Sequence, residues 1–449
     1  MRTQIFSCCM VAILVGAQLA LPGPGQALTM DQCVAMALKN NPGQQRQQLD
    51  VTLADKEIRQ EKSRNFGRLD FVSGYTHYNT PRTLTPMTPA TMAGSPESVP
   101  TTRNLFTTGI VYEVPLFTGF AQTRAVEIAH LRKQMARAAL KLSREQLIYN
   151  VKTLYVNILS LMAQAKAQDD YVNSLKRLHD DVAAKLKLGR LAKIDLLKAD
   201  ADLQNGRAVA RQIRSNLTIM RGGLAALLAV DELDKLEDIP ISGKTMQPAP
   251  QDIAGRETLQ TLSRIRKEEL NIEKNEKAID RAASVYYPQL AISSSYGQNY
   301  GPNDDSHLNS GDWENQEVWQ AGLTLKWNIF DFGSTRAAIQ KSRLAARQAR
   351  LNRLQTELDL KKNLLEATAR INTAISDYTS ARAEAAMTRE TEAIEQVRFD
   401  QGAADIVDLL TTKARNRLAQ SRLIDSGYTY LSNRYYLDYL LEQGGKEEQ

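Results

Sequence analysis

Residues 318–330 read V-W-Q-A-G-L-T-L-K-W-N-I-F, with apolar and polar side chains in alternation. The side chains at odd positions from Trp319 to Ile329 are all apolar, while those between them are polar or small. A period of two predicts a β-strand with two unlike faces. At about 3.3 Å per residue, Trp319 and Trp327 lie roughly 26 Å apart along the strand, close to the roughly 25 Å apolar band of an outer membrane barrel. A single strand of this kind is more often half-buried in a β-sandwich. The rest of the chain is therefore needed to distinguish a sandwich strand from a strand of a membrane barrel.

The composition favours helices and a modest charge. Of 449 residues, 43% are hydrophobic and 24% are charged, which is within the globular range. Aromatic residues make up only 6%, whereas Ala, Leu, Gln, Lys, Arg and Glu are abundant, which is typical of helical proteins. The net charge of +6 is small for this length, and basic residues are interspersed with acidic ones. Nucleic-acid binding is therefore disfavoured.

The first residues predict export from the cytoplasm. Residues 1–27 contain Arg2, an apolar run and the small-residue pair Gly25-x-Ala27, which together predict a signal peptide cut after Ala27. Cys8 and Cys9 come too early to follow an apolar run as a lipidated cysteine would, so they do not indicate a lipid anchor. Past the signal no stretch approaches the roughly 20 apolar residues of a membrane helix. The exported chain is thus expected either to be soluble outside the cytoplasm or to enter an outer membrane as a barrel.

The sequence contains one unit twice. A shift of 213 aligns residues 106–117 with 319–330 so that the same positions are apolar in both. The same shift aligns residues 189–197 with 402–410, which share the pattern G-x5-D-L-L. Two distant motifs that obey one shift indicate an internal duplication. Each copy then holds a β-hairpin, and the four expected strands cover residues 68–78, 105–117, 289–300 and 317–330.

Long helices follow each hairpin. Residues 121–187 contain neither proline nor glycine and carry a sustained heptad pattern, as do residues 335–400 in the second copy. Each long helix ends at the glycine of G-x5-D-L-L, and a second helix returns antiparallel to it. A further helix precedes each hairpin, at residues 30–65 and 252–283. The expected organisation is a signal peptide, a first repeat, a linker, a second repeat and a polar tail: 1–27, 28–230, 231–251, 252–441 and 442–449.

Four strands cannot close a barrel. A closed barrel needs about eight or more strands, because an open edge in lipid leaves backbone groups unpaired. Several chains must therefore share one barrel: two chains supply eight strands, whose interior side chains fill, and three supply twelve, which can leave a lumen. The polar face is expected to line the lumen, with Gln320, Thr324, Lys326 and Asn328. The apolar face is expected to meet lipid, with Phe106, Ile110, Tyr112, Trp319, Leu323, Leu325 and Trp327.

The chain resembles the outer membrane efflux protein family, the TolC-like channels. The resemblance is carried by residues 28–42, by P-L-F-T-G-F at 115–120 with its echo N-I-F-D-F-G at 328–333, and by the two glycine turns. It implies an α+β membrane protein that forms a homotrimer, with a 12-stranded barrel continued by an α-helical coiled-coil tunnel across the periplasm. It also implies partnership with a periplasmic adaptor and an inner-membrane transporter of the RND, ABC or MFS type. Such a conduit serves drug efflux, metal efflux or type I protein secretion.

The resemblance places the glycine turns at the periplasmic tip. It implies contacts with the adaptor from the two turns and their neighbours: Leu188, Gly189, Arg190, Gln401, Gly402 and Ala403. It also implies a constriction formed by aspartates, namely Asp195, Asp405 and Asp408. The alternative for Asp195 and Asp408 is that they stabilise the first turns of their helices. Related channels can hold the tip shut with a tyrosine hydroxyl, but Phe399 and Leu186 stand at those positions here.

The remaining residues form no recognisable catalytic or metal-binding motif. His77, His130, His179 and His307 lack metal-ligand spacing, and no catalytic triad, phosphate loop or CxxC motif occurs. We therefore expect no enzyme, no metal and no cofactor. Two other classes of protein fit part of the pattern. A trimeric surface adhesin would not require the duplicated unit, and a periplasmic coiled-coil adaptor would leave the apolar strand face unexplained.

Overall fold

A computed structural model describes residues 27–94, 99–243, 246–250, 256–304 and 311–445. The expected signal peptide lies outside these residues except for Ala27, and His307 lies outside them as well. The chain divides into two compact units. The first, called here the helical unit, contains Asn150–Met246, Ala374–Ser432 and the described residues up to Leu38. The second, called the sheet unit, contains Lys39–Tyr149, Gln247–Thr373 and the described residues from Asn433 onward.

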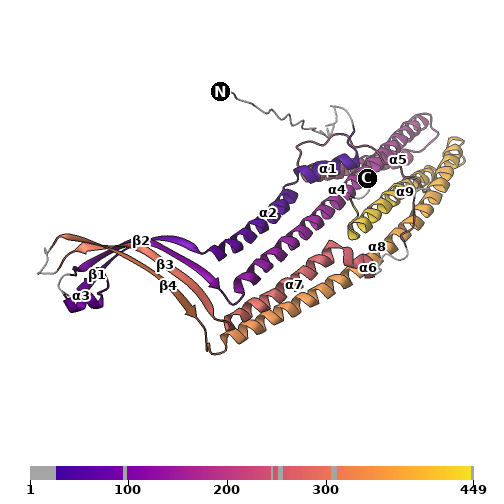
Figure 1. The fold of residues 1–449 in the computed structure, drawn as a ribbon. Coiled ribbons are helices and arrows are strands. Elements are labelled where there is room, and N and C mark those ends of the chain that lie inside the picture. Colours follow the sequence, from indigo (N-terminus) through magenta and orange to yellow (C-terminus); the bar gives the residue numbers. More distant parts are fainter. Residues whose placement is uncertain (1–26, 95–98, 244–245, 251–255, 305–310, 446–449) are drawn as a thin grey trace, which may run out of the picture. The chain divides into compact units, whose positions relative to one another are not determined.

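The sheet unit contains one antiparallel sheet of four strands (Figure 1). They are β1 (Arg68–Thr83), β2 (Thr101–Phe117), β3 (Gln289–Pro302) and β4 (Trp313–Lys326), in the order β1-β2-β3-β4. The four predicted strands are confirmed, and β1 and β4 form the edges. A six-residue helix, α3 (Pro89–Gly94), in the connection between β1 and β2 was not expected.

The last strand begins and ends four residues earlier than predicted. The expected strand ran to residue 330, but β4 ends at Lys326, which pairs with Gln289, the first residue of β3. The register places Pro288 opposite Trp327, and proline has no backbone N–H to donate; a 3₁₀ turn, Ser284–Tyr286, comes shortly before it. Trp327 instead donates a hydrogen bond from Nε1 to the carbonyl oxygen of Tyr286 at 3.1 Å. Strand pairing, and not the apolar pattern, sets this end.

The helix before the first hairpin is interrupted. The expected helix at 30–65 is two helices, α1 (Met30–Asn40) and α2 (Pro42–Ser63), followed by a 3₁₀ turn. Asn41 is extended, and its side chain accepts hydrogen bonds from the backbone N–H groups of Gly43 and Gln44. Pro42 occupies the first position of α2, where its missing N–H is harmless. Similarly, residues 252–283 hold α6 (Arg256–Thr261) and α7 (Ser263–Ala283), which meet at Leu262.

Long helices form antiparallel hairpins (Figure 1). α4 (Ala121–Lys187) and α8 (Ser334–Asp400) each have 67 residues, so the two predicted long helices are confirmed. α5 (Lys193–Leu228) returns from α4, and α9 (Ile406–Leu440) returns from α8. In the helical unit, the hydroxyl of Tyr155 on α4 lies 2.9 Å from the carbonyl oxygen of Leu28 and 2.7 Å from that of Glu237. The beginning of the first repeat and the linker are thus both held against α4.

The segment after α9 is packed, although a loose polar tail was expected. The buried carboxylate of Glu442 accepts hydrogen bonds from the backbone N–H groups of Ser263 at 2.8 Å and Arg264 at 3.0 Å. It also lies 3.2 Å from the ammonium group of Lys141. The residue before α7, Leu262, has no side chain that could cap the helix, so Glu442 serves as a cap from elsewhere in the chain.

We predict that Glu442→Ala destabilises the sheet unit. Losing the acceptor leaves two buried N–H groups of α7 unpaired, which costs about 1–3 kcal/mol in the free energy of unfolding. The measurement is thermal unfolding of the purified trimer followed by circular dichroism. Glu273→Ala, on the exposed face of α7, is the matched control and is expected to leave the midpoint unchanged. Equal midpoints for the two variants would contradict the capping role.

Candidate functional site

One face of the sheet is apolar and exposed. Cross-strand partners fall into rows, one of which runs Phe71, Ile110, Tyr296 and Trp319 through all four strands. In the single chain Phe71 is 74% exposed and Trp319 is 71% exposed. Burying a side chain of this size contributes about 1.5–3 kcal/mol, so a contiguous face of them requires an apolar surrounding. Of the residues predicted to meet lipid, the following lie on this face within strands: Phe106, Ile110, Tyr112, Trp319, Leu323 and Leu325. Trp327 lies just past the end of β4.

The opposite face is largely polar or small. Gln320, Thr324 and Lys326 alternate with the apolar residues of β4, and their partners on β3 are Ser295, Ala291 and Gln289. Asn328, which was predicted to join them, lies beyond the strand.

Three charged residues on this polar face were not predicted. Arg68 lies 3.0 Å from Asp70 and 3.6 Å from Glu113, between the oxygens of two carboxylates. The signal was available in the sequence, because all three alternate with the apolar residues Leu69 and Tyr112.

Both glycine turns have the same hydrogen-bonded geometry. Gly189 has φ of 70° and Gly402 has φ of 75°, a left-handed conformation that side chains other than glycine rarely adopt. The N–H of Gly402 donates to the carbonyl oxygen of Phe399 at 3.1 Å, and that of Ala403 to Arg398 at 2.8 Å. The N–H groups of Gly189 and Arg190 make the equivalent bonds in the first copy. This pattern is the Schellman motif, and it satisfies the last carbonyl groups of each long helix.

The turns present a continuous exposed surface. All six residues predicted to contact an adaptor are exposed: Leu188, Gly189, Arg190, Gln401, Gly402 and Ala403. Behind them the two hairpins share one apolar core, to which four helices contribute. Its buried members are Leu175, Leu178, Val182, Ala199, Leu203, Phe399, Ile406, Leu409 and Leu410. The turns are therefore held on a packed base in which both copies of the unit participate.

A lysine of α4 lies against Phe399 near the end of α8. The ammonium group of Lys185 on α4 lies 4.5 Å from the centre of the Phe399 ring on α8, within cation–π range. It also lies 2.8 Å from Asp181 and 3.8 Å from Asp400. The ends of α4 and α8 are thus joined without a tyrosine hydroxyl.

The three predicted constriction aspartates differ in their surroundings. The carboxylate of Asp195 accepts a hydrogen bond from the backbone N–H of Ala192 at 3.1 Å, which is the helix-stabilising role given above as the alternative. Asp405 accepts a longer bond, 3.4 Å, from the N–H of Val407 at the start of α9. Asp408 is exposed, and its carboxylate makes no hydrogen bond or ion pair within the part of the chain that the structure describes.

A buried ion pair within the second hairpin was missed by the sequence reasoning, and its lysine also contacts the first hairpin. Lys413 on α9 is 5% exposed, and its ammonium group lies 3.0 Å from Glu392 on α8 and 2.9 Å from the hydroxyl of Ser174 on α4. Asn416 donates a further hydrogen bond to Glu392. A lysine at an inward helix position has no sequence signature that separates it from a solvated one, because its partners come from other helices.

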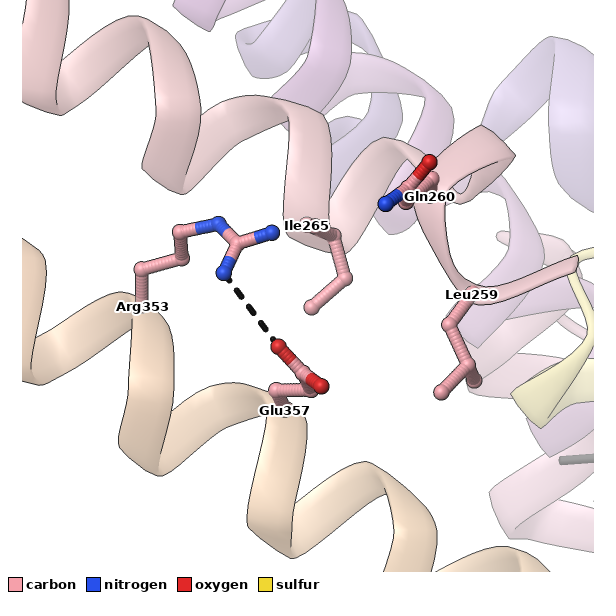
Figure 2. Close-up of a pocket in the computed structure, with 5 residues that line it drawn as sticks. All are labelled: Leu259, Gln260, Ile265, Arg353 and Glu357. Atoms are coloured by element: carbon pink, nitrogen blue, oxygen red, sulfur yellow. Dashed lines mark hydrogen bonds and ion pairs between the residues drawn. The ribbon is translucent and has the colours of Figure 1, made fainter. Parts of the chain in front are cut away.

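The described residues contain no metal-binding cluster, and the cavity of the sheet unit is small. No group of three or more His, Cys, Asp or Glu residues among them is arranged to hold a metal ion. Figure 2 shows a cavity of about 140 Å³ in the sheet unit, where Arg353 and Glu357 of α8 form an ion pair beside Leu259, Gln260 and Ile265. Ligand pockets are about 300–1,000 Å³, so this cavity is too small for a drug-sized molecule.

Among the described helices, none combines the length and apolarity needed to cross a membrane.

Comparisons with known proteins agree with this architecture. The model of the family described as "Outer membrane efflux protein" matches residues 33–230 and 255–441. A membrane protein from Pseudomonas aeruginosa has a similar structure, with a TM-score of 0.77, 17% identity, and coverage of 92% of this chain and 91% of that one. CusC has a TM-score of 0.76 and 16% identity, with coverage of 92% of this chain and 91% of that one. CmeC from Campylobacter jejuni has a TM-score of 0.75 and 16% identity, with coverage of 94% of this chain and 87% of that one. No curated protein matches the sequence.

A four-stranded sheet with open edges and an exposed apolar face, joined to paired helical hairpins, defines one subunit of a trimeric outer membrane channel. The chain belongs to the outer membrane efflux protein family. Three copies complete a twelve-stranded barrel continued by a coiled-coil helical tunnel, and the channel serves efflux. The predicted family, fold class and channel function are confirmed, and nothing favours a surface adhesin or a soluble adaptor.

We predict that Gly402→Ala weakens the second turn. No atom lies within 4 Å of an added Cβ at this position, so the cost arises from the left-handed backbone alone, about 1–2 kcal/mol. The measurement is the midpoint of thermal unfolding of the purified trimer. Gly222→Ala is the matched control, because an added Cβ at Gly222 also has no atom within 4 Å. Gly222 lies within α5, so alanine is expected to raise the free energy of unfolding by up to about 1 kcal/mol. A loss of stability in both variants would contradict this account.

Proposed function

We propose that this channel conducts substrates from an inner-membrane transporter, through a periplasmic adaptor, to the outside of the cell. The observation that supports it is the sheet with two unlike faces and two unpaired edges, which has a place only in a shared barrel. The transporter is of the RND, ABC or MFS type, and the cargo is a toxic compound or, in the alternative, a protein secreted by the type I route. Residues 1–27 direct export, and the helical tunnel lies in the periplasm.

The two faces of the sheet divide between lipid and lumen. The apolar face with Trp319, Leu323 and Leu325 meets lipid, because its exposed apolar area is unfavourable in water. The polar face with Gln320, Thr324 and Lys326 lines the lumen. Arg68 with its two carboxylates lies on the same polar face, so the lumen also carries paired charges.

The glycine turns form the end that meets the adaptor. The six exposed turn residues, 188–190 and 401–403, are the contact surface, and the shared apolar core behind them keeps it in shape. Asp408 is the constriction residue. Three Asp408 carboxylates close together attract cations. Asp195 holds the start of α5, and Asp405 holds the start of α9.

We predict that Asp408→Asn reduces the cation selectivity of the channel. The substitution removes the charge at an exposed position without deleting a hydrogen bond, so folding is expected to be unaffected. Single-channel recording in planar bilayers, with and without divalent cations, measures selectivity and block. Asp195→Asn is the matched control, since an amide oxygen can still accept from the N–H of Ala192. If cation selectivity falls equally in both variants, or in neither, Asp408 is not the constriction residue.

The transport role is tested by removing the chain from its cell. We predict greater sensitivity to toxic compounds, or loss of a secreted protein from the medium, with rescue by the intact gene. A second arm replaces Gly189 and Gly402 together by valine, which strains both turns at the surface offered to the adaptor. A chain whose removal changes neither sensitivity nor secretion is not a conduit.

A further inference from the structure

A second group of aromatic residues lies on the apolar face of the sheet. Tyr75, Phe106, Tyr300 and Trp313 come from β1, β2, β3 and β4, one from each strand. The ring centres of Tyr75 and Phe106 are 4.7 Å apart, those of Phe106 and Tyr300 5.4 Å, and those of Phe106 and Trp313 5.3 Å. These distances are typical of interacting aromatic rings. The four rings form one continuous surface, called here the aromatic shelf.

The shelf is separated from the apolar band by a polar row. Tyr75 pairs with Phe106, which pairs with Tyr300, so these side chains share the face of Ile110 and Trp319. One row closer to the apolar band, the same face presents four polar side chains in register: Ser73, Thr108, Gln298 and Glu317. The shelf therefore lies on the membrane-facing side of the sheet but outside the apolar band.

The position of the polar row fits the edge of the hydrocarbon layer. Glu317 precedes Trp327 by ten residues, roughly 33 Å along an extended strand, or about 25 Å of membrane depth at a strand tilt near 40°. The apolar band of such barrels is about 25 Å tall. Trp327 lies at the end of β4 nearest the helices, and the polar row at the opposite edge of the band. The shelf is about 5 Å further out, at the level of the lipid headgroups.

The chemistry of the shelf is that of a sugar-binding surface. Tyr75 and Trp313 are 56% and 61% exposed and offer flat faces on which the C–H groups of a sugar ring can stack. Beside them, the side-chain oxygen of Asn104 accepts a hydrogen bond from the hydroxyl of Tyr75 at 2.9 Å and lies 2.8 Å from Nδ1 of His77. The amide of Asn104 therefore has its NH₂ group available to a hydroxyl, within the described residues.

The charge of the shelf disfavours phosphate. Neither the shelf nor the polar row contains a lysine or an arginine, and Glu317 contributes a carboxylate. A phosphate headgroup is bound by cations, whereas amide and carboxylate groups beside aromatic rings pair with neutral hydroxyls. The saccharide of a glycolipid suits this surface better than a phospholipid headgroup does.

We propose that the aromatic shelf binds the saccharide part of glycolipid in the outer leaflet of the membrane. The occupant follows from two observations: the shelf continues the membrane-facing side of the sheet beyond the apolar band, and it is rich in rings and hydrogen-bonding groups but without cations. The proposal rests on the proposed function, because it takes the apolar face as the lipid-facing one and the ends of the strands away from the helices as the outer ones.

The test compares glycolipid with phospholipid on the intact trimer. Lipopolysaccharide is added to the purified trimer in nanodiscs of phosphatidylethanolamine and phosphatidylglycerol, and retained molecules are counted by native mass spectrometry. Trp313→Leu and Tyr75→Leu each remove one exposed ring and keep an apolar side chain, so folding is preserved. Each is expected to weaken lipopolysaccharide binding about two- to tenfold and to leave phospholipid retention unchanged.

Trp319→Leu is the matched control, because Trp319 is 71% exposed on the same face but lies inside the apolar band. It is expected to bind lipopolysaccharide like the unchanged protein. Wild-type lipopolysaccharide affinity in both shelf variants overturns the proposal, as does an equal loss of phospholipid in them. Failure of the unchanged protein to insert into nanodiscs at all would instead count against the proposed function.

Discussion

The unpaired backbone at the two edges of the sheet is the constraint on which the structure depends. β1 and β4 are each hydrogen-bonded to one neighbour only, so one row of N–H and C=O groups on each strand faces outward. In hydrocarbon an unpaired group of this kind costs several kcal/mol, and no water is present to satisfy it. The apolar side chains place these strands in hydrocarbon. The edges can then be satisfied only by the edges of further copies, so the subunit and its assembly are parts of one fold.

The two copies of the repeated unit share their turn geometry and one apolar core in the helical unit, but they differ in their polar contacts. Both turns keep the same Schellman geometry, and both hairpins contribute to one apolar core. Under the shift of 213, the buried pair Glu392 and Lys413 corresponds to His179 and Asp200. In the first copy His179 instead lies 3.2 Å from its neighbour Asp180. The buried ion pair is therefore a property of the second copy, while the apolar core belongs to both.

Local pattern allowed most of the fold to be predicted. The heptads end at Lys187 and Asp400 because glycine follows each within two residues, and such signals need no knowledge of neighbours. The residues that sequence reasoning missed depend on partners from elsewhere. The end of β4 at Lys326 depends on the start of β3, and the cap provided by Glu442 depends on the N–H groups of α7. Asp195 and Asp408 hold the same place in the motif, yet only the carboxylate of Asp195 caps its helix.

The polar face of the sheet and the region of Asp408 differ in how far their charges are compensated. On the polar face of the sheet, Arg68 lies between Asp70 and Glu113, and Lys326 adds a second positive charge. Two cations and two carboxylates cancel, and paired charges exert only a weak field on a passing ion. Asp408, by contrast, has no compensating cation in contact within the described residues. In the ring that we propose, three such carboxylates add to one another, which would make a charge filter stronger at the glycine turns than in the barrel.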